Sequence, residues 1–288
     1  MSKKFFARTL RAAAAAALCL SIAAPTAFSQ AGVTPSVKPA GNQDAAKDAP
    51  KQAATDERAE AVLRRAVDAL GGGAYLGVRS MVSRGYFTPF TEGVGGLPVT
   101  FLDYLVFPDR ERTEFKGRGV SSIQTNTGET GWLFEGKTKK ISDATPEQVR
   151  DFRISMRTSL DNVLRGWWRT EGAALSYVGR REAGLARRNE VVRLTYADGF
   201  VVEFEFGAKD NLPGKARYKK EAAAGGETIE EEDRYAQFQL LGGVRVPFII
   251  DHYRAGVQSS RVNYQEVEFN RAVPDSLFSK PAVSKALK

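Results

Sequence analysis

Cysteine and histidine are almost absent from this chain of 288 residues, which contains one of each, Cys19 and His252. A single cysteine excludes a disulfide within the chain, and one histidine leaves zinc and iron sites without their usual ligands. His252 falls within an apolar, strand-like run, most plausibly on a sheet face or at the surface, and no motif supplies a partner serine. We therefore expect no metal, no cofactor and no catalytic residue. A hydrolase that depends on His252 is an alternative that the sequence does not favour.

Long apolar runs are also scarce, and the run at the N-terminus predicts export rather than a membrane span. Residues 1–29 combine a basic start, an apolar core too short to cross a bilayer, and small residues just before Gln30. This pattern predicts a signal peptide over 1–29 that is cleaved before Gln30, and a periplasmic location. Lipidation at Cys19 is an alternative, although the bulky Leu18 before it is atypical of a lipidation site.

Charge of one sign is not in large excess once this segment is removed. The signal contains basic residues and no acidic ones, so the formal net charge falls from +8 to +4. Basic and acidic side chains alternate along the rest of the chain, unlike the basic patch of a nucleic-acid-binding protein, and we expect no nucleic-acid partner. Residues 30–54 are rich in Ala and Pro and predict a disordered linker, residues 55–281 predict the folded domain, and residues 282–288 form a basic tail.

Two helices are predicted. Thr55 is placed to cap a helix that runs to Leu70 and stops at the glycines 71–73. Thr145 begins a second helix, with proline next and glutamine in the capping-box position. Apolar residues at spacings of three and four then predict one helix over 146–168: Val149, Phe152, Met156, Leu160, Val163 and Trp167. Such a face must lie on an apolar surface, either as core packing or as a movable lid.

The remaining apolar runs predict strands joined by tight turns. Ala197-Asp198-Gly199 and Gly242-Gly243 are strong hairpin signals, and a third run follows Ala255-Gly256. The expected strands are 78–87, 99–107, 110–116, 119–125, a run from Trp132, 188–196, 200–207, 217–222, 227–239, and the two runs that follow the last two turns. We therefore predict a mainly β (α+β) fold: an open antiparallel half-barrel of about ten or eleven strands with helices covering the concave face.

An apolar interior with no evident polar site predicts an acyl-chain cavity. In 200–206 aromatic and apolar residues alternate with the carboxylates Glu203 and Glu205, and residues 99–107 are apolar on both faces. Each CH₂ transferred from water into such a cavity gains about 0.8 kcal/mol, so one acyl chain can bind without polar recognition. The predicted lining is Leu102, Tyr104, Val106, Trp132, Phe134, Phe152, Met156, Leu160, Val202, Phe204, Phe206, Phe248 and Ile250. The rival interpretation is a cavity filled by the protein's own side chains.

Two basic pairs near turns, Arg180-Arg181 and Arg187-Arg188, have no role in this interpretation. They are compatible with contact to anionic head groups and equally with ordinary surface solubility.

Several short segments, taken in order over about 57–281, resemble the periplasmic lipoprotein-carrier superfamily of LolA/LolB-like outer-membrane lipoprotein-sorting proteins. These segments are Ala69-Leu70-Gly71-Gly72, Leu105-Val-Phe-Pro-Asp-Arg-Glu-Arg112, Asn126-Thr-Gly-Glu-Thr-Gly-Trp132, Tyr177-Val-Gly-Arg-Arg-Glu-Ala-Gly184, Leu241-Gly-Gly-Val-Arg-Val-Pro247 and Val273-Pro-Asp-Ser-Leu-Phe278. The resemblance implies an unclosed antiparallel barrel whose concave side accepts acyl chains. In one respect the chain departs from the family: Phe107 stands before the proline, where the classical carrier has a basic residue that latches the lid.

The sequence and the resemblance together favour a carrier rather than an enzyme. We expect a monomeric periplasmic protein that binds acyl chains of a lipoprotein or lipid in outer-membrane trafficking, with inner- and outer-membrane transport components as further partners. An envelope-stress sensor or interaction protein that uses the same fold is the main alternative.

Overall fold

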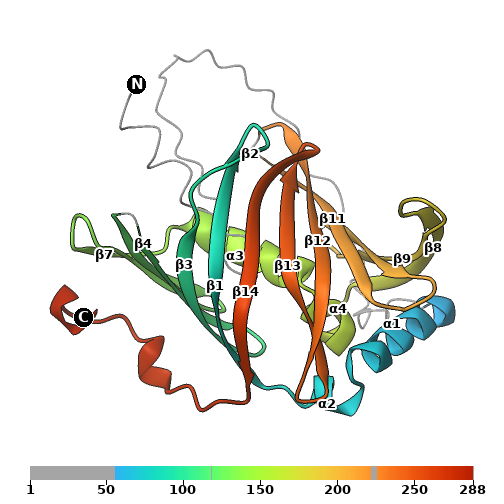
Figure 1. Ribbon diagram of the computed structural model, residues 1–288, viewed down its shortest axis with the longest axis horizontal. Coiled ribbons are helices and arrows are strands. Elements are labelled where there is room, and N and C mark those ends of the chain that lie inside the picture. The colour runs from blue at the N-terminus through green and yellow to red at the C-terminus, as the bar shows by residue number, and fades with distance from the viewer. Residues whose placement is uncertain (1–55, 118, 222–225, 288) are drawn as a thin grey trace, which may run out of the picture.

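One open antiparallel sheet organises the molecule (Figure 1). The computed structural model describes residues 56–117, 119–221 and 226–287. Within these ranges thirteen strands follow the order β7-β6-β5-β4-β3-β1-β14-β13-β12-β11-β10-β9-β8, and β2 pairs with β1. The strands are β1 Ser80–Thr91, β2 Val94–Gly95, β3 Val99–Val106, β4 Arg110–Gly117, β5 Val120–Thr127, β6 Thr130–Glu135, β7 Lys140–Asp143, β8 Ala174–Glu182, β9 Arg188–Thr195, β10 Val201–Gly207, β11 Pro213–Glu221, β12 Thr228–Leu241, β13 Val244–Arg254 and β14 Val257–Phe269.

The mainly β, open-sheet prediction is confirmed, but the expected number of ten or eleven strands is too low. The described residues form a fourteen-stranded sheet, and the strands that were not predicted are β2, β7 and β8. β2 has two residues, β7 has four polar or half-exposed ones, and β8 is an edge strand whose positions are half-buried or exposed, apart from Leu175. None of the three has the buried alternation that identifies a strand in sequence.

Both predicted helices begin close to their predicted signals, and each needs one correction. The helices are α1 Glu57–Leu70, α2 Gly73–Leu76, α3 Pro146–Thr158 and α4 Leu160–Arg165, with 3₁₀ turns η1 Trp167–Glu171, η2 Asp275–Leu277 and η3 Ser284–Leu287. Asp56 rather than Thr55 caps α1, because its carboxylate accepts bonds from the N–H groups of Arg58 and Ala59. The predicted capping box at Thr145 and Gln148 is present.

The single helix predicted over 146–168 is wrong, because the chain breaks at Ser159. This residue has an extended ψ of 147°, and its hydroxyl accepts a hydrogen bond from the N–H of Asn162, so that it caps α4. A serine that bonds neighbouring backbone groups competes with helix continuation. Gly166 then ends α4 in the left-handed region at φ 78°.

The apolar core lies on the inner face of the sheet beneath α1 and α4. It joins Leu63 of α1, Val163 of α4 and Trp168 to the inward side chains of β9–β13, including Phe204. Phe204 and Trp168 are almost completely inaccessible to solvent. This part of the half-barrel is therefore filled by the protein's own side chains.

The C-terminal segment runs beside the β4–β7 wing (Figure 1), and its contacts lie on the outer face of that wing. The indole N–H of Trp132 donates to the carbonyl of Phe278, and Arg112 donates to the carbonyl of Leu277. Phe278 is buried, and Leu287 packs on a second apolar cluster of Ile123, Trp132 and Phe134. Leu277 and Phe278 thus attach the C-terminal segment to the outer face of the sheet.

Other sequence predictions concern parts of the chain outside the described residues. The signal peptide over 1–29 and the linker over 30–54 fall there, and Cys19 with them. Among the described residues, no helix combines the length and the apolar composition needed to cross a bilayer.

Gly71 joins the end of α1 to the predicted hairpin at Gly242-Gly243, which the pairing of Leu241 with Val244 confirms. Gly71 has φ 125°, and a Cβ there would lie 2.2 Å from the carbonyl oxygen of Gly243. We expect Gly71→Ala to lower the free energy of unfolding by about 2–3 kcal/mol, because strain and a backbone clash add. Urea denaturation measures this. Gly172→Ala has positive φ but open space around it, and should cost clearly less.

Candidate functional site

A small cavity lies between the α3–α4 junction and the sheet. Its volume is about 120 Å³, and its wall includes Tyr75, Phe107, Leu160, Tyr235, Ile250 and Tyr264. Ligand pockets usually measure about 300–1,000 Å³, so the cavity in this state holds only part of an acyl chain. A larger ligand requires the cavity to widen, and α3, whose buried face is polar, is the element that can move away from the sheet.

Five of the residues predicted to line the cavity lie on the outer face of the sheet instead. The cross-strand pairs Tyr104–Arg112 and Thr125–Trp132 belong to one face, which the C-terminal segment covers. The misplaced residues are Leu102, Tyr104, Val106, Trp132 and Phe134. Both faces of β3 are apolar and both are covered, so the sequence does not show which of the two faces points into the half-barrel.

The other predicted lining residues lie inside or beside the half-barrel. Val202, Phe204, Phe206, Phe248 and Ile250 belong to the core cluster, and Leu160 packs against it. Of these, only Leu160 and Ile250 border the cavity. Phe152 is buried, whereas Met156 borders an open groove on the other side of α3. The acyl-binding role of these residues stays a prediction.

The face of α3 that is buried is polar, contrary to the predicted apolar face. Apart from Phe152, its buried residues are Gln148, Asp151, Ser155 and Thr158. The sequence pattern pointed instead to Val149 and Met156, which are only half-buried. The inner sheet face opposite α3 must therefore supply polar partners, because unpaired buried polar groups are costly.

A buried ion pair ties α3 to the sheet. The Lys220 Nζ of β11 lies 2.9 Å from Asp151 Oδ1, with the two side chains only 11% and 2% exposed. Burial raises the pKa of Asp151, and the hydrogen bond and charge of Lys220 oppose that rise. This contact attaches α3 to β11 on the inner face of the sheet, which is the face that also borders the cavity.

His252 lies two strands away from Lys220, on the same inner face. Its Nδ1 is 2.6 Å from Asp233 Oδ1, and its buried Nε2 has no hydrogen-bond partner among the described residues. Burial lowers the pKa of His252, but the Asp233 carboxylate outweighs it and the pKa is raised. The sheet-face prediction is met, while the surface alternative is wrong because only 6% of the residue is exposed.

A pair of buried carboxyl groups occupies the inner face of β3 and β4. Asp103 and Glu111 are each 2% exposed. The Thr113 hydroxyl donates to Asp103 Oδ1 at 2.7 Å, whereas Asp103 Oδ2 and Glu111 Oε1 have no hydrogen-bond partner among the described residues. Burial raises the pKa of Asp103 to about 7, and burial with repulsion from Asp103 raises the pKa of Glu111 well above its ordinary value.

The sequence contains a signal for this carboxyl pair that was not used. Asp103 is in phase with Phe101 and Leu105, so a carboxylate alternates with apolar residues on one face of a strand with cover on both sides. The polar residues of α3 and Asp233 had no comparable signal. In the described residues, no group of three or more His, Cys, Asp or Glu side chains is arranged to hold a metal ion.

Arg165 fixes α4 against Phe107, the residue before the proline between β3 and β4. Its guanidinium lies 4.5 Å from the centre of the Phe107 ring, pairs with Asp161, and donates to the carbonyls of Tyr75 and Val78. These contacts attach α4 both to the α2 segment and to the end of β3.

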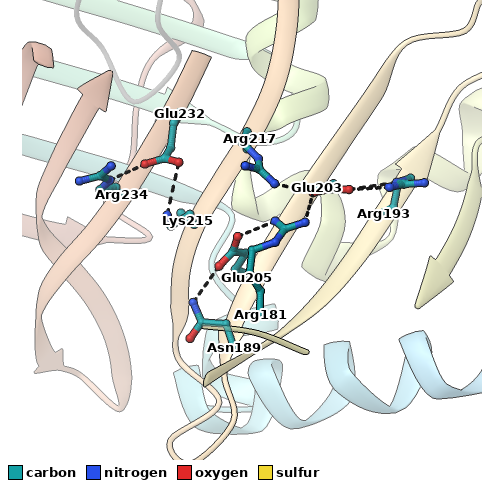
Figure 2. A network of polar contacts seen from close by, with 9 residues as sticks. All are labelled: Arg181, Asn189, Arg193, Glu203, Glu205, Lys215, Arg217, Glu232 and Arg234. Carbon is teal, nitrogen blue, oxygen red and sulfur yellow. Dashed lines mark hydrogen bonds and ion pairs between the residues drawn. The ribbon is translucent and has the colours of Figure 1, made fainter. Parts of the chain in front are cut away.

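The outer face of β8–β12 carries a network of ion pairs (Figure 2). Glu203 accepts hydrogen bonds from Arg181, Arg193 and Arg217, and Arg181 also bonds to Glu205. Burial opposes ionisation, but the three arginines lower the pKa of Glu203 to about 2. The carboxylates of 200–206 therefore lie on the outer face of the sheet, opposite the core side chains Val202, Phe204 and Phe206.

Solved structures establish the fold. A LolA superfamily protein from Nitrosomonas europaea is 14% identical, with a TM-score of 0.54 over 77% of this chain and 97% of that one. A DUF1329 family protein from Desulfovibrio piger is 11% identical, with a TM-score of 0.55 over 78% and 98%. A putative outer membrane lipoprotein-sorting protein domain from Vibrio parahaemolyticus is 11% identical, with a TM-score of 0.52 over 77% and 97%. No family sequence profile and no curated protein sequence matches the chain. The chain has a LolA-like fold.

Proposed function

We propose that this protein is a periplasmic carrier that binds an acyl chain of a lipid or lipoprotein between α4 and the sheet. The observation that carries the proposal is the cavity of about 120 Å³ at the α3–α4 junction of a LolA-like half-barrel. Its wall is mostly aromatic and aliphatic and suits hydrocarbon, with Asp161, Arg165, Asp233 and Arg245 as its charged members. The chain's one histidine, His252, does not line the cavity and is buried and paired with Asp233. These features favour binding over catalysis.

The cavity must enlarge to take a whole chain, and α3 is the covering helix that polar contacts hold to the sheet. α3 and α4 are short, and Ser159 between them has extended backbone geometry. Polar contacts rather than a continuous apolar interface hold α3, chiefly the Lys220–Asp151 pair. Breaking a few directional contacts is compatible with a hinged lid, whereas the Phe204 region is packed against α1 and the rest of the core.

A variant that fills the cavity tests the proposal without emptying the core. Ser155 lines the cavity on the α3 side. We expect Ser155→Leu to weaken binding of a fluorescent fatty acid at least about 10-fold, since each excluded methylene is worth about 0.8 kcal/mol. The melting temperature should stay the same or rise, because the larger side chain occupies empty space.

The matched control is Ser176→Leu, the same change at an exposed position of β8, which should bind as the wild type does. Lipid that co-purifies with the wild-type protein is identified by mass spectrometry and should be absent from Ser155→Leu. If the wild-type protein carries no lipid and does not bind the fatty acid, the proposal is wrong. Phe204→Asp is not a suitable test, because a charge in the filled core disrupts folding itself.

A further inference from the structure

The turn between β8 and β9 presents an apolar side chain at its apex. Leu185 is 99% exposed, the largest exposure of any large hydrophobic residue in the described ranges. The turn is well formed, because the N–H of Ala183 donates to the carbonyl of Arg187 and the N–H of Arg187 donates to the carbonyl of Gly184. A fixed turn therefore holds Leu185 in solvent, at a transfer cost that nothing in the domain offsets.

Basic side chains surround this apex. Arg187, Arg188 and Lys209 are exposed and border a shallow concavity of about 820 Å³ beside the turn, with Glu182 as its one acidic residue. None of the three basic groups forms an ion pair with another described residue. By contrast, the neighbouring Arg181 is bonded to Glu203 and Glu205 (Figure 2) and anchors the hairpin to the outer face.

The hairpin also lies where a flat surface can reach it. In Figure 1 it projects from the side of the molecule opposite the C-terminal segment, above α1. The β10–β11 turn adds Lys209 to the same surface, because the N–H of Ala208 donates to the carbonyl of Arg188. Leu185 and the three cations thus border one concavity that two adjoining turns form.

We propose that the β8–β9 turn docks the protein on an anionic phospholipid surface, with Leu185 entering the interface and Arg187, Arg188 and Lys209 contacting lipid phosphates. A bilayer surface offers negative charge directly above hydrocarbon, so it accommodates both features at once. Nucleic acid and acidic protein match the charge but give Leu185 no hydrocarbon layer to enter. The proposal does not depend on the acyl-chain cavity, which lies on the inner face.

The test is co-sedimentation of the full chain with vesicles of phosphatidylglycerol and phosphatidylcholine, compared with vesicles of phosphatidylcholine alone. We expect binding only to the anionic vesicles, weakening as salt rises. Arg187→Gln with Arg188→Gln should bind about 30-fold more weakly, from about fivefold per basic residue near a membrane. Leu185→Ser should weaken binding at least about fivefold by losing its apolar contact. The tryptophan introduced by Leu185→Trp should show a blue-shifted emission with anionic vesicles, beyond the wild-type change.

The matched control is Lys137→Gln with Lys139→Gln, two exposed lysines of the β6–β7 turn, which should bind as the wild type does. Equal loss in this control, or undiminished binding by the double arginine variant, would overturn the proposal. So would soluble polyglutamate or duplex DNA that displaces the protein while Leu185→Ser binds normally, since the surface would then be a general anion site. Fatty-acid binding, measured separately on the same variants, should be unchanged.

Discussion

Replacing Lys220 with methionine is expected to lower the free energy of unfolding by about 3–5 kcal/mol, because it leaves the Asp151 carboxyl buried without its cation. Asp151 is 2% exposed, and Lys220 is the group that pairs with it across the α3–sheet interface. The loss should shrink at low pH, where Asp151 takes up a proton and no longer needs a partner. Urea denaturation at pH 5 and pH 8 measures both effects.

Two further variants separate the ion pair from general damage to α3. Arg153 is also on α3, and Arg153→Met removes its ion pair with Glu129, which lies before β6. The two side chains are 57% and 86% exposed. This substitution should change stability by less than about 1 kcal/mol. Lys220→Met combined with Asp151→Leu should recover most of the loss, since buried ion pairs can be replaced by apolar residues at little cost. A double variant as unstable as Lys220→Met would contradict this account.

The same interface gives a functional prediction for the lid. If the carrier proposal holds, Lys220→Met should bind a fluorescent fatty acid faster than the wild type at a temperature where both are folded, because α3 is released from β11. Stopped-flow fluorescence measures the rate. Unchanged kinetics in a destabilised Lys220→Met variant would show that α3 does not gate the cavity.

Asp103→Asn is expected to stabilise the protein at pH 8 by a few kcal/mol, since one pKa unit corresponds to about 1.4 kcal/mol. Burial raises the pKa of Asp103 from 3.8 to about 7. The favourable contribution of the neutral form is fully present below the unfolded value of 3.8 and is lost as pH rises through about 7. An asparagine keeps the acceptor for Thr113, remains neutral at every pH, and adds N–H donors beside Glu111.

The measurement is the free energy of unfolding of Asp103→Asn and the wild type between pH 4 and pH 8. The two curves should lie close together at pH 4 and diverge toward pH 8. Asp275→Asn, at an exposed carboxyl paired with Arg110, should run parallel to the wild type over this range. Equal destabilisation by Asp103→Asn at both ends would mean that the carboxyl is ionised and paired instead.

Glu203 has the opposite effect on the pH dependence of the free energy of unfolding. Its pKa falls from 4.5 to about 2 in the folded state, so its contribution is present above 4.5 and is lost as pH drops toward 2. The outer network therefore makes the folded state more stable at neutral pH. The buried carboxyl pair of Asp103 and Glu111 makes it more stable at acid pH.

Local patterns predicted the elements whose signals are short-range. The capping box at Thr145, the Gly242-Gly243 turn and the alternation over 200–206 each depend on neighbouring residues, and each appears in the structure as expected. The break at Ser159 was missed because the apolar spacing continues across it, although serine is a common helix cap.

The faces of the elements were harder to predict than the elements themselves. β3 is apolar on both sides, so only its pairing partners show that Phe101 faces the core and Tyr104 the C-terminal segment. For α3 the buried side is mostly polar, and Lys220 supplies a cation opposite Asp151.

The sequence by itself determined a mainly β half-barrel with covering helices, because hydrophobic alternation and turn residues act over a few positions. Only the tertiary structure decided what fills the half-barrel. Burial depends on which residues from distant strands and helices meet, and this placed Phe204 in a filled core, left a cavity beside Leu160, and buried Asp103 with Glu111. Their raised pKa values follow from that burial, which no local pattern specifies.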